Sequence, residues 1–310
     1  MADRAKLSRL NALADFDIRL LRVFIAVVEE GGYVGAQARL NISPSTLSEH
    51  IKDLEYRLGC TVCLRGRSGF KLTEQGDSLY KAARTLFGQL EAFRNQVSDI
   101  AGRAEGTLNI GVVDGLATET MLRLPDVLRE FSSLKPLVVI DLSVGSPPDL
   151  ELSLLQGELD VIVGPFPAER PGLLYEKLYD ESESLFCGLG NPLFGRPSDA
   201  LSDEEVCNLP LVALDYPSFA NLQRFKPHVF ARTIEAATLL ILSGKYIGFL
   251  PRHVTLPHVK NHLLWEIDEA RYAFCAAFSV VSRDVNVMDP FLKLLLTLLR
   301  RKRSGDVART

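Results

Sequence analysis

Small polar and charged side chains gather at the start of a predicted helix between Ser43 and Gly59. Ser43 can accept a hydrogen bond as the N-cap, Pro44 fits the first helical position because it has no N–H to satisfy, and Gly59 is a helix stop. Side chains of this kind at a helix start can hydrogen-bond base edges in the major groove of DNA. The residues from which we expect DNA contacts are Ser43, Ser45, Thr46, Ser48, Glu49, His50 and Lys52.

Two shorter helical patterns must position this helix. From Ile18 to Val28 apolar residues recur every three or four positions, and Gly31-Gly32 ends that segment. Ala36 and Leu40 share one face of a second helix, after which Asn41-Ile42-Ser43 makes a turn. In the third helix the side chains that we expect to point inward are Leu47, Ile51, Leu54 and Leu58.

A basic loop follows the third helix and ends at Leu72-Thr73-Glu74-Gln75-Gly76. Its Arg65, Arg67 and Lys71 are suited to contact DNA, where cationic side chains mostly meet phosphates. Helix, turn, helix and wing in this order predict a DNA-binding domain. Up to Leu72 there are 11 Lys and Arg against 8 Asp and Glu, and after it 24 against 31. This basic excess is modest, so we expect specific binding to need several domains together.

A heptad pattern follows the wing. Apolar side chains step by four and three residues in alternation, the spacing of a helix that packs on another helix. Two interpretations are open: a contact between two subunits, or a helix buried against its own domain. The seam consists of Leu79, Ala83, Leu86, Leu90, Phe93, Val97 and Ile100.

Composition favours a protein of the cytoplasm. The five cysteines are an odd number, residues 1–14 lack the apolar core of a secretion signal, and no apolar run reaches the length of a membrane span. Cys60 and Cys63 form a Cys-x-x-Cys pair, but no second pair or nearby histidine completes a zinc site. We therefore expect no metal and no cofactor.

From Gly106 onward short apolar strands alternate with helices, which predicts an α/β domain with a mostly parallel sheet. The first elements that we expect are strands at 108–113, 138–144 and 161–163, and helices at 121–131 and 150–155. Ligands of such sheets lie at the carboxyl ends of the strands, close to helix N-termini. The loops at 114–118 and 145–148 are therefore the candidate ligand-binding loops.

The N-terminal residues resemble the LysR-type transcriptional regulators. The family pattern is matched at 20–24, 36–40, 43–48, 58–59 and 72–76, and also by Ile51, Glu55 and Arg65. Gln37 and Cys63 depart from it, at what we expect to be packing positions. The resemblance implies a winged helix-turn-helix that binds double-stranded promoter DNA. It also implies that the heptad helix pairs antiparallel with its copy in a homodimer or homotetramer, and it leaves RNA polymerase open as a further partner.

The C-terminal half resembles the effector-binding domain of the same family, which is built like a periplasmic binding protein from two lobes with a small-molecule effector between them. Matches lie at 106–111, 157–160 and 243–251. The resemblance places Ser146 where the family holds its effector. On the opposite loop the usual Ser or Thr is replaced by Gly115, preceded by Asp114. The effector contacts that we expect are Asp114, Gly115, Thr118, Ser146, Glu235 and Thr238.

Asp114 has two interpretations of its own. A carboxylate at a loop tip is ordinarily a turn residue or a helix cap. As a ligand contact, it would favour a cationic or hydroxylated effector over a dicarboxylate.

We therefore expect an α+β multi-domain protein that acts as an effector-controlled transcription regulator and is not an enzyme, because no nucleophile motif, cofactor loop or histidine cluster is present. A regulator with a vestigial sensor is the first alternative. A solute-binding protein is the second, and it leaves residues 16–100 unexplained. The expected parts are an extension (1–14), a DNA-binding domain (15–73), a linker helix (74–103) and an effector domain (106–303), with lobe I at 106–176 and 275–303 and lobe II at 177–274.

Overall fold

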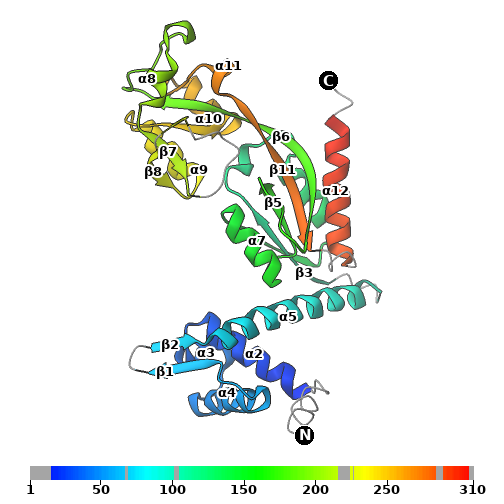
Figure 1. Ribbon diagram of the computed structural model, residues 1–310. Coiled ribbons are helices and arrows are strands. Elements are labelled where there is room, and N and C mark those ends of the chain that lie inside the picture. The colour runs from blue at the N-terminus through cyan, green and yellow to red at the C-terminus, as the bar shows by residue number, and fades with distance from the viewer. Residues whose placement is uncertain are drawn as a thin grey trace. The chain divides into compact units, whose positions relative to one another are not determined.

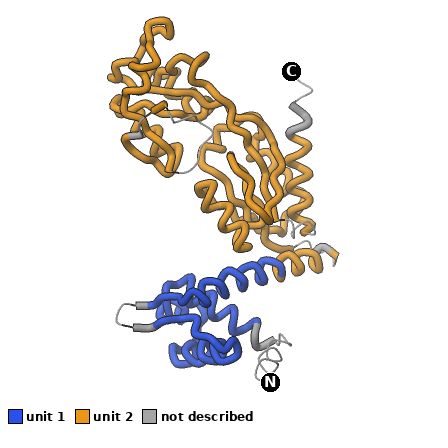
Figure 2. The backbone as a smooth tube through the Cα atoms, in the orientation of Figure 1, with its two compact units in different colours: residues 1–89 blue, residues 90–310 orange. Residues whose placement is uncertain are grey.

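The computed structural model describes residues 15–66, 69–100, 105–215, 224–225, 227–283 and 289–306. The chain forms two compact units, a head of residues 1–89 and a sensor of residues 90–310 (Figures 1 and 2). Among the described helices, none combines the length and the apolar character needed to cross a membrane.

The head is three helices followed by a two-stranded wing and the first turns of a long helix. Its elements are α2 (Asp15–Glu29), α3 (Tyr33–Leu40), α4 (Pro44–Leu58), β1 (Cys63–Gly66), β2 (Gly69–Leu72) and α5 (Glu74–Ile100). The predicted caps of α4 are confirmed: the Ser43 side chain accepts from the Thr46 N–H at 3.2 Å, and Gly59 takes the left-handed conformation at φ 69°. The strands pair antiparallel, with Cys63 opposite Leu72.

One hydrophobic core holds the head together. Leu47, Ile51 and Leu54 of α4 are buried against Leu20 and Phe24 of α2, as the spacing predicted. Burial of each such side chain contributes about 1.5–3 kcal/mol. The expectation that position 37 is a packing position is wrong, because Gln37 is exposed while Ala36 beside it is fully buried.

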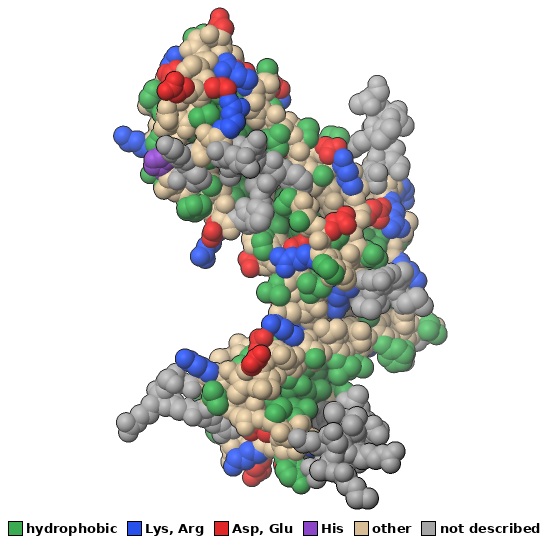
Figure 3. Space-filling view, viewed as in Figure 1, with side chains coloured by type: hydrophobic (Ala, Val, Ile, Leu, Met, Phe, Trp, Pro, Cys, Tyr) green, Lys and Arg blue, Asp and Glu red, His purple; other side chains and the backbone are tan. Residues whose placement is uncertain are grey.

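The heptad seam of α5 divides into two parts. Ala83 is buried in the head, and Leu79 and Leu86 pack against the same core. The later seam residues are Leu90, Phe93, Val97 and Ile100, all of them exposed. Hydrophobic side chains are visible on this end of α5 in Figure 3. The interpretation of α5 as a helix packed on its own domain therefore holds for its first turns, whereas the seam side chains of its last turns are exposed.

The sensor is built on one continuous sheet in the order β4-β3-β5-β11-β6-β9-β7-β8, with β10 also paired to β6. The strands are β3 (Gly106–Val112), β4 (Val138–Val144), β5 (Val161–Pro165), β6 (Leu173–Gly188), β7 (Leu211–Leu214), β8 (Pro227–Ala231), β9 (Ile247–Pro251), β10 (Leu264–Glu266) and β11 (Phe274–Arg283). The expectation of a mostly parallel sheet is wrong. Parallel pairs occur at β3·β4, β3·β5, β7·β8 and β7·β9, but the pairs that involve the long strands β6 and β11 are antiparallel.

The strands β6 and β11 run through both lobes (Figure 1). Leu173 and Leu178 of β6 lie in the first hydrophobic core, whereas Leu185 and Cys187 lie in a second. The stretch of β6 between Leu178 and Leu185 is thus where the chain passes from one lobe to the other. Helices cover both lobes: η1 (Leu116–Thr118), α6 (Leu124–Leu134), α7 (Pro147–Gln156), η2 (Ser198–Ala200), α8 (Asp203–Cys207), α9 (Ile234–Leu242), α10 (Arg252–Lys260), α11 (Glu269–Tyr272) and α12 (Pro290–Asp306).

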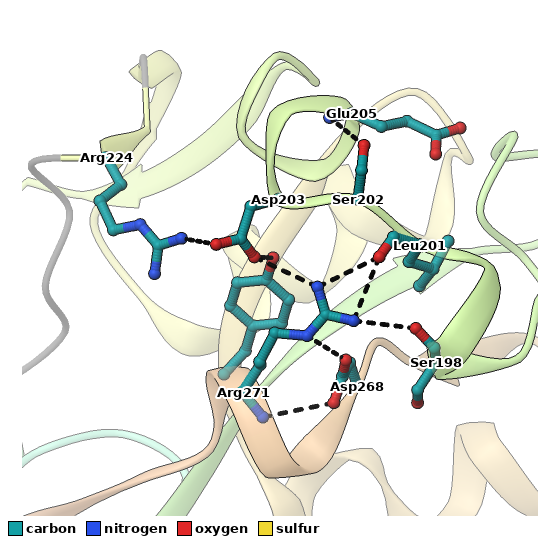
Figure 4. A network of polar contacts seen from close by, with 9 residues as sticks. Ser198, Leu201, Ser202, Asp203, Glu205, Arg224, Asp268 and Arg271 are labelled. Atoms are coloured by element: carbon teal, nitrogen blue, oxygen red, sulfur yellow. Dashed lines mark hydrogen bonds and ion pairs between the residues drawn. The ribbon is translucent and has the colours of Figure 1, made fainter.

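A polar network in the second lobe joins α11 to η2 and α8 (Figure 4). The Arg271 guanidinium donates to the carbonyl oxygens of Ser198 at 2.8 Å and Leu201 at 3.1 Å, and it pairs with Asp268 at 2.5 Å. Asp203 accepts from the Tyr272 hydroxyl at 2.8 Å. Because these contacts engage the guanidinium within the lobe, Arg271 has a structural role there.

The last turns of α5 are anchored to the sensor core by Asn95. Its Nδ2 donates to the Asp289 carboxylate at 2.9 Å and to the Thr107 carbonyl oxygen at 3.2 Å. Gly106 allows this close approach, since a Cβ there would lie 2.2 Å from Asn95 Oδ1. A rearrangement of this core would therefore move the end of the linker helix.

Candidate DNA-binding surface and effector cleft

The first turn of α4 presents a cluster of hydroxyl groups. Ser43 Oγ lies 2.8 Å from Ser45 Oγ and 2.9 Å from Thr46 Oγ1, so the three hydroxyls share hydrogen bonds. Glu49 and Lys52 follow on the same helix and are exposed. Ser48 is half-buried. This surface offers donors, acceptors and one cation, which is the chemistry that base edges and phosphates require.

His50 lies differently from what the sequence suggested. Its Nε2 atom is buried and has no hydrogen-bond partner among the described residues. That atom is therefore turned into the head and not toward solvent. The helical spacing did place His50 near the polar face, but it could not show which way the ring turns.

Glu55 connects α4 to the wing. Its Oε1 accepts from the backbone N–H groups of Val62 at 2.8 Å and Cys63 at 3.2 Å. Val62 is fully buried and Cys63 nearly so. Glu55 therefore positions the wing, a role that required the fold to be seen.

The turn from the wing into α5 depends on the side chain of Thr73 and on the small size of Gly76. Thr73 Oγ1 donates to the Thr61 carbonyl oxygen at 2.8 Å and accepts from the Gly76 N–H at 2.9 Å. A Cβ at Gly76 would lie 2.0 Å from the Val62 carbonyl oxygen. Only glycine fits there. Of the wing cations, Lys71 is exposed, while the side chain of Arg65 and all of Arg67 lie outside the described residues.

The candidate effector cleft consists of two neighbouring cavities that both include Asp114. The larger has a volume of about 470 Å³ and is bordered by Val144, Ser146, Asp149, Arg232 and Thr233. The smaller, of about 30 Å³, is bordered by Glu181, Glu183, His253 and Phe278, among others. We call them the outer cavity and the inner cavity. Both carboxyl-end loops named from the sequence reach the outer one.

Asp114 acts as a cap for a helix of the other lobe. Its Oδ2 accepts from the Ile234 N–H at 2.5 Å and from the Glu235 N–H at 3.4 Å, both at the start of α9. Burial raises the pKa of the carboxyl group, and the backbone donors oppose this. The helix-cap interpretation is thus confirmed, although the capped helix lies 120 residues away. Gly115 beside it takes φ 86°, a conformation that suits glycine.

Ser146 is engaged at the start of α7. Its hydroxyl donates to the Asp149 carboxylate at 2.6 Å, and the Asp149 N–H approaches it at 3.4 Å. Its side chain still borders the outer cavity. Ser146 is therefore a helix cap at the edge of the cleft.

A second connection crosses the cleft from Thr118. Its hydroxyl lies 2.8 Å from His253 Nδ1, and His253 Nε2 lies 2.9 Å from Glu181 Oε1. His253 is not among the residues predicted from the sequence, and its side chain is 13% exposed. Glu181 and Glu183 were not predicted either, because they are two of several charged residues in the polar middle of β6 and match no motif.

The two second-lobe candidates lie away from both cavities. Glu235 is exposed and borders neither cavity. Thr238 is buried, and its hydroxyl donates to the Ile234 carbonyl oxygen at 2.7 Å within α9. Of the predicted contacts, Asp114 and Ser146 thus border the outer cavity, and Thr118 reaches the inner cavity only through His253. The inner cavity adds Glu181, Glu183 and His253, which the sequence did not predict.

Comparison with known proteins matches both parts of the chain. Residues 18–77 match the bacterial regulatory helix-turn-helix protein, lysR family, and residues 101–304 match the LysR substrate binding domain. The HTH-type transcriptional activator BauR of Pseudomonas aeruginosa is 37% identical over 278 residues, which cover 88% of this chain and 91% of BauR.

Solved structures share the fold at lower identity. The full-length CbnR structure in complex with its target DNA has a TM-score of 0.64 at 22% identity and covers 92% of this chain and 99% of CbnR. LysG from Corynebacterium glutamicum, solved with bound effector Arg, has a TM-score of 0.58 at 20% identity and covers 93% of this chain and 98% of LysG. With both family models matched and a relative aligned along most of its length, the chain belongs to the LysR family: it is a DNA-binding transcription regulator with an effector-binding domain.

Proposed function

We propose that this regulator binds promoter DNA as a dimer or tetramer and changes its assembly when a small molecule occupies the cleft between the lobes. The observation that carries the second part is the pair of contacts across the cleft, Asp114 to the start of α9 and Thr118 to His253. With these contacts made, the inner cavity measures only about 30 Å³. A ligand that enters must displace or separate these contacts, so its binding shifts the population of lobe arrangements.

For DNA, we propose that Glu49 reads a base edge and that Lys52 contacts a phosphate. Both are exposed on α4, and a carboxylate can accept from a cytosine amino group. Arg65, Arg67 and Lys71 of the wing would add phosphate contacts. We also propose that the subunits associate through the exposed seam residues of α5, because these four apolar side chains follow the heptad spacing and are exposed to solvent in the single chain.

The link between sensor and head would run through Asn95. Because Asn95 fixes the end of α5 to Asp289 and Thr107, a lobe movement that shifts the sensor core would also move the linker helix. We propose that the head domains of a dimer thereby change their spacing on two half-sites. CbnR, which has this fold, was solved with its target DNA, and BauR is named an activator.

The test is a footprint upstream of the gene of this protein and its neighbours, followed by selection of binding sites with the parent and with Glu49→Ala. We expect Glu49→Ala to relax the base preference at one position per half-site by about 1–3 kcal/mol. Lys52→Ala is the matched control, since loss of a phosphate contact weakens binding on all sequences and reduces the salt slope by roughly one. An unchanged preference in Glu49→Ala would remove Glu49 from the reading surface.

A vestigial sensor is the second candidate, because Asp114, Ser146 and His253 at the cleft already have partners within the described part of the protein. A thermal-shift screen of small molecules separates the two. We propose a regulatory and not a catalytic role, and a place in the cytoplasm, where bacterial DNA lies; these follow from the regulators that the chain resembles.

A further inference from the structure

Two carboxylates share one face of β6 where this strand passes between the lobes. Glu181 and Glu183 are two residues apart, so their side chains point to the same side of the sheet. Both border the inner cavity, together with Asp114 of the first lobe. The structure therefore gathers three acidic groups from two lobes around one small space.

The positive charge that would balance them is missing from this cavity. Among its described lining residues there is no lysine or arginine, and His253 is the one basic group. Both ring nitrogens of His253 are already engaged, Nε2 with Glu181 and Nδ1 with the Thr118 hydroxyl. The neighbouring Arg252 turns instead to Glu266 at 3.1 Å and to Glu269.

Glu183 has no hydrogen bond or ion pair to any described residue, which is unusual for a half-buried carboxylate. The strands on either side of it offer none: Pro251 of β9 and Phe274 of β11 stand opposite. The titratable groups that face it are Glu181, Asp114 and His253. A group that can donate hydrogen bonds and carries positive charge would satisfy this carboxylate.

A second buried polar atom lies nearby. The hydroxyl of Tyr179 is buried and makes no hydrogen bond of good geometry within the described part of the chain, and the carboxylate of Glu181 lies close to it. Its ring stacks on Phe278, with centroids 5.0 Å apart, and Phe278 borders the inner cavity. The pKa of Tyr179 is raised, first by burial, then by the negative charges of Glu181 and Glu119, and last by hydrogen bonding toward the Glu181 carboxylate. An acceptor oxygen and an aromatic ring thus lie beside the acidic pair.

We propose that the effector of this protein is a primary amine, whose ammonium group enters the inner cavity between Glu181 and Glu183. This proposal rests on the cleft being the effector site. An ammonium group has three donors, which match the two carboxylates and the Tyr179 hydroxyl. A cavity of about 30 Å³ holds one group of the size of a water molecule, and the outer cavity, which shares Asp114, holds the remainder of the ligand.

Proton release accompanies this binding. Burial and the neighbouring Glu181 raise the pKa of Glu183 to about 8, so the carboxyl group is mostly protonated at neutral pH. An ammonium ion binds the ionised form and displaces that proton. The affinity then rises about tenfold from pH 6 to pH 7, because the ionised fraction grows tenfold per unit below the pKa, and it levels off above pH 8.

The experiment uses the full chain and methylammonium chloride as the probe, with thermal unfolding as the readout over this pH range. Tetramethylammonium chloride is the matched salt, since it carries the charge without N–H donors, and methanol is the neutral match. We expect methylammonium alone to raise the unfolding temperature, increasingly so toward pH 8. Glu183→Gln should lose both the rise and its pH dependence. Asp180→Asn, which removes an exposed carboxylate of the same strand, should keep both.

Equal shifts with methylammonium and tetramethylammonium, or an unaltered response in Glu183→Gln and Glu181→Gln, would overturn the proposal. Two other outcomes distinguish a failure of the amine proposal from a failure of the proposed sensor function. If a molecule without an amine alters promoter binding and this response depends on Asp114, the cleft is a sensor but the amine class is wrong. If no small molecule alters promoter binding while methylammonium still stabilises the parent, the cavity binds amines but does not regulate.

Discussion

Removal of Glu55 tests how far the position of the wing depends on its contact with α4. In Glu55→Ala the N–H groups of Val62 and Cys63 lose their acceptor, and both residues are buried. Each buried donor left without a partner costs about 1–3 kcal/mol, so opening of the wing should become easier by roughly 2–4 kcal/mol. Glu55→Gln keeps an acceptor oxygen and should lose only about 1 kcal/mol, the difference between a charged and a neutral acceptor.

Hydrogen exchange of the full chain measures this loss locally. Protection of the Val62 and Cys63 amides should fall roughly 30- to 1000-fold in Glu55→Ala, at 1.4 kcal/mol per factor of ten. The matched control is Asp53→Ala, which removes an exposed carboxylate from the same helix. DNA affinity should fall on all sequences alike in Glu55→Ala, because the wing cations are displaced and the base-reading face of α4 is unchanged. Exchange rates that match those of Asp53→Ala would refute the assignment of Glu55 as the anchor of the wing.

Three further predictions concern the sensor and the linker. Glu183→Gln should be more stable than the parent above pH 8 and equal to it below pH 4.5, because the parent, whose Glu183 pKa is raised from 4.5 to about 8 on folding, loses up to about 1.4 kcal/mol of stability per pH unit over that interval. Urea unfolding at several pH values measures the difference in stability, and a difference that does not change with pH would contradict this reasoning. Leu90→Lys should split dimers in sedimentation without unfolding the head, whereas Leu86→Lys should destabilise the head itself, since Leu86 packs in its core; the reverse pattern would show that the seam is misassigned. Ser146→Ala should lower the stability of the sensor by about 1 kcal/mol through loss of the α7 cap, measured by urea unfolding, and a value near zero would mean that the cap contributes nothing.

Local patterns in the sequence were sufficient for the helices of the head. Ser43, Pro44 and Gly59 predicted both ends of α4, and the three-and-four spacing predicted its buried side, because caps and helical faces depend on residues only a few positions apart. The same reasoning placed Ser146 at the start of a helix.

Contacts between distant segments were decided by the tertiary structure. The sequence could name Asp114 as a cap but not the helix that it caps, because α9 begins 120 residues later. Nor could it divide the seam of α5, since Leu86 and Leu90 have the same spacing and differ only in what lies beside them. Strand direction was misjudged for the same reason: an alternation of strands and helices does not show that β6 and β11 cross both lobes antiparallel to their neighbours.

The inner cavity shows this difference most clearly. Glu181, Glu183 and His253 carry no motif, and in the sequence they are two of several charges in one strand and a histidine two positions after Pro251. Their meeting depends on β6 passing from one lobe to the other beside α10. Spacing along the chain determines which side of an element a residue occupies, whereas the packing of elements decides which charges share one buried space.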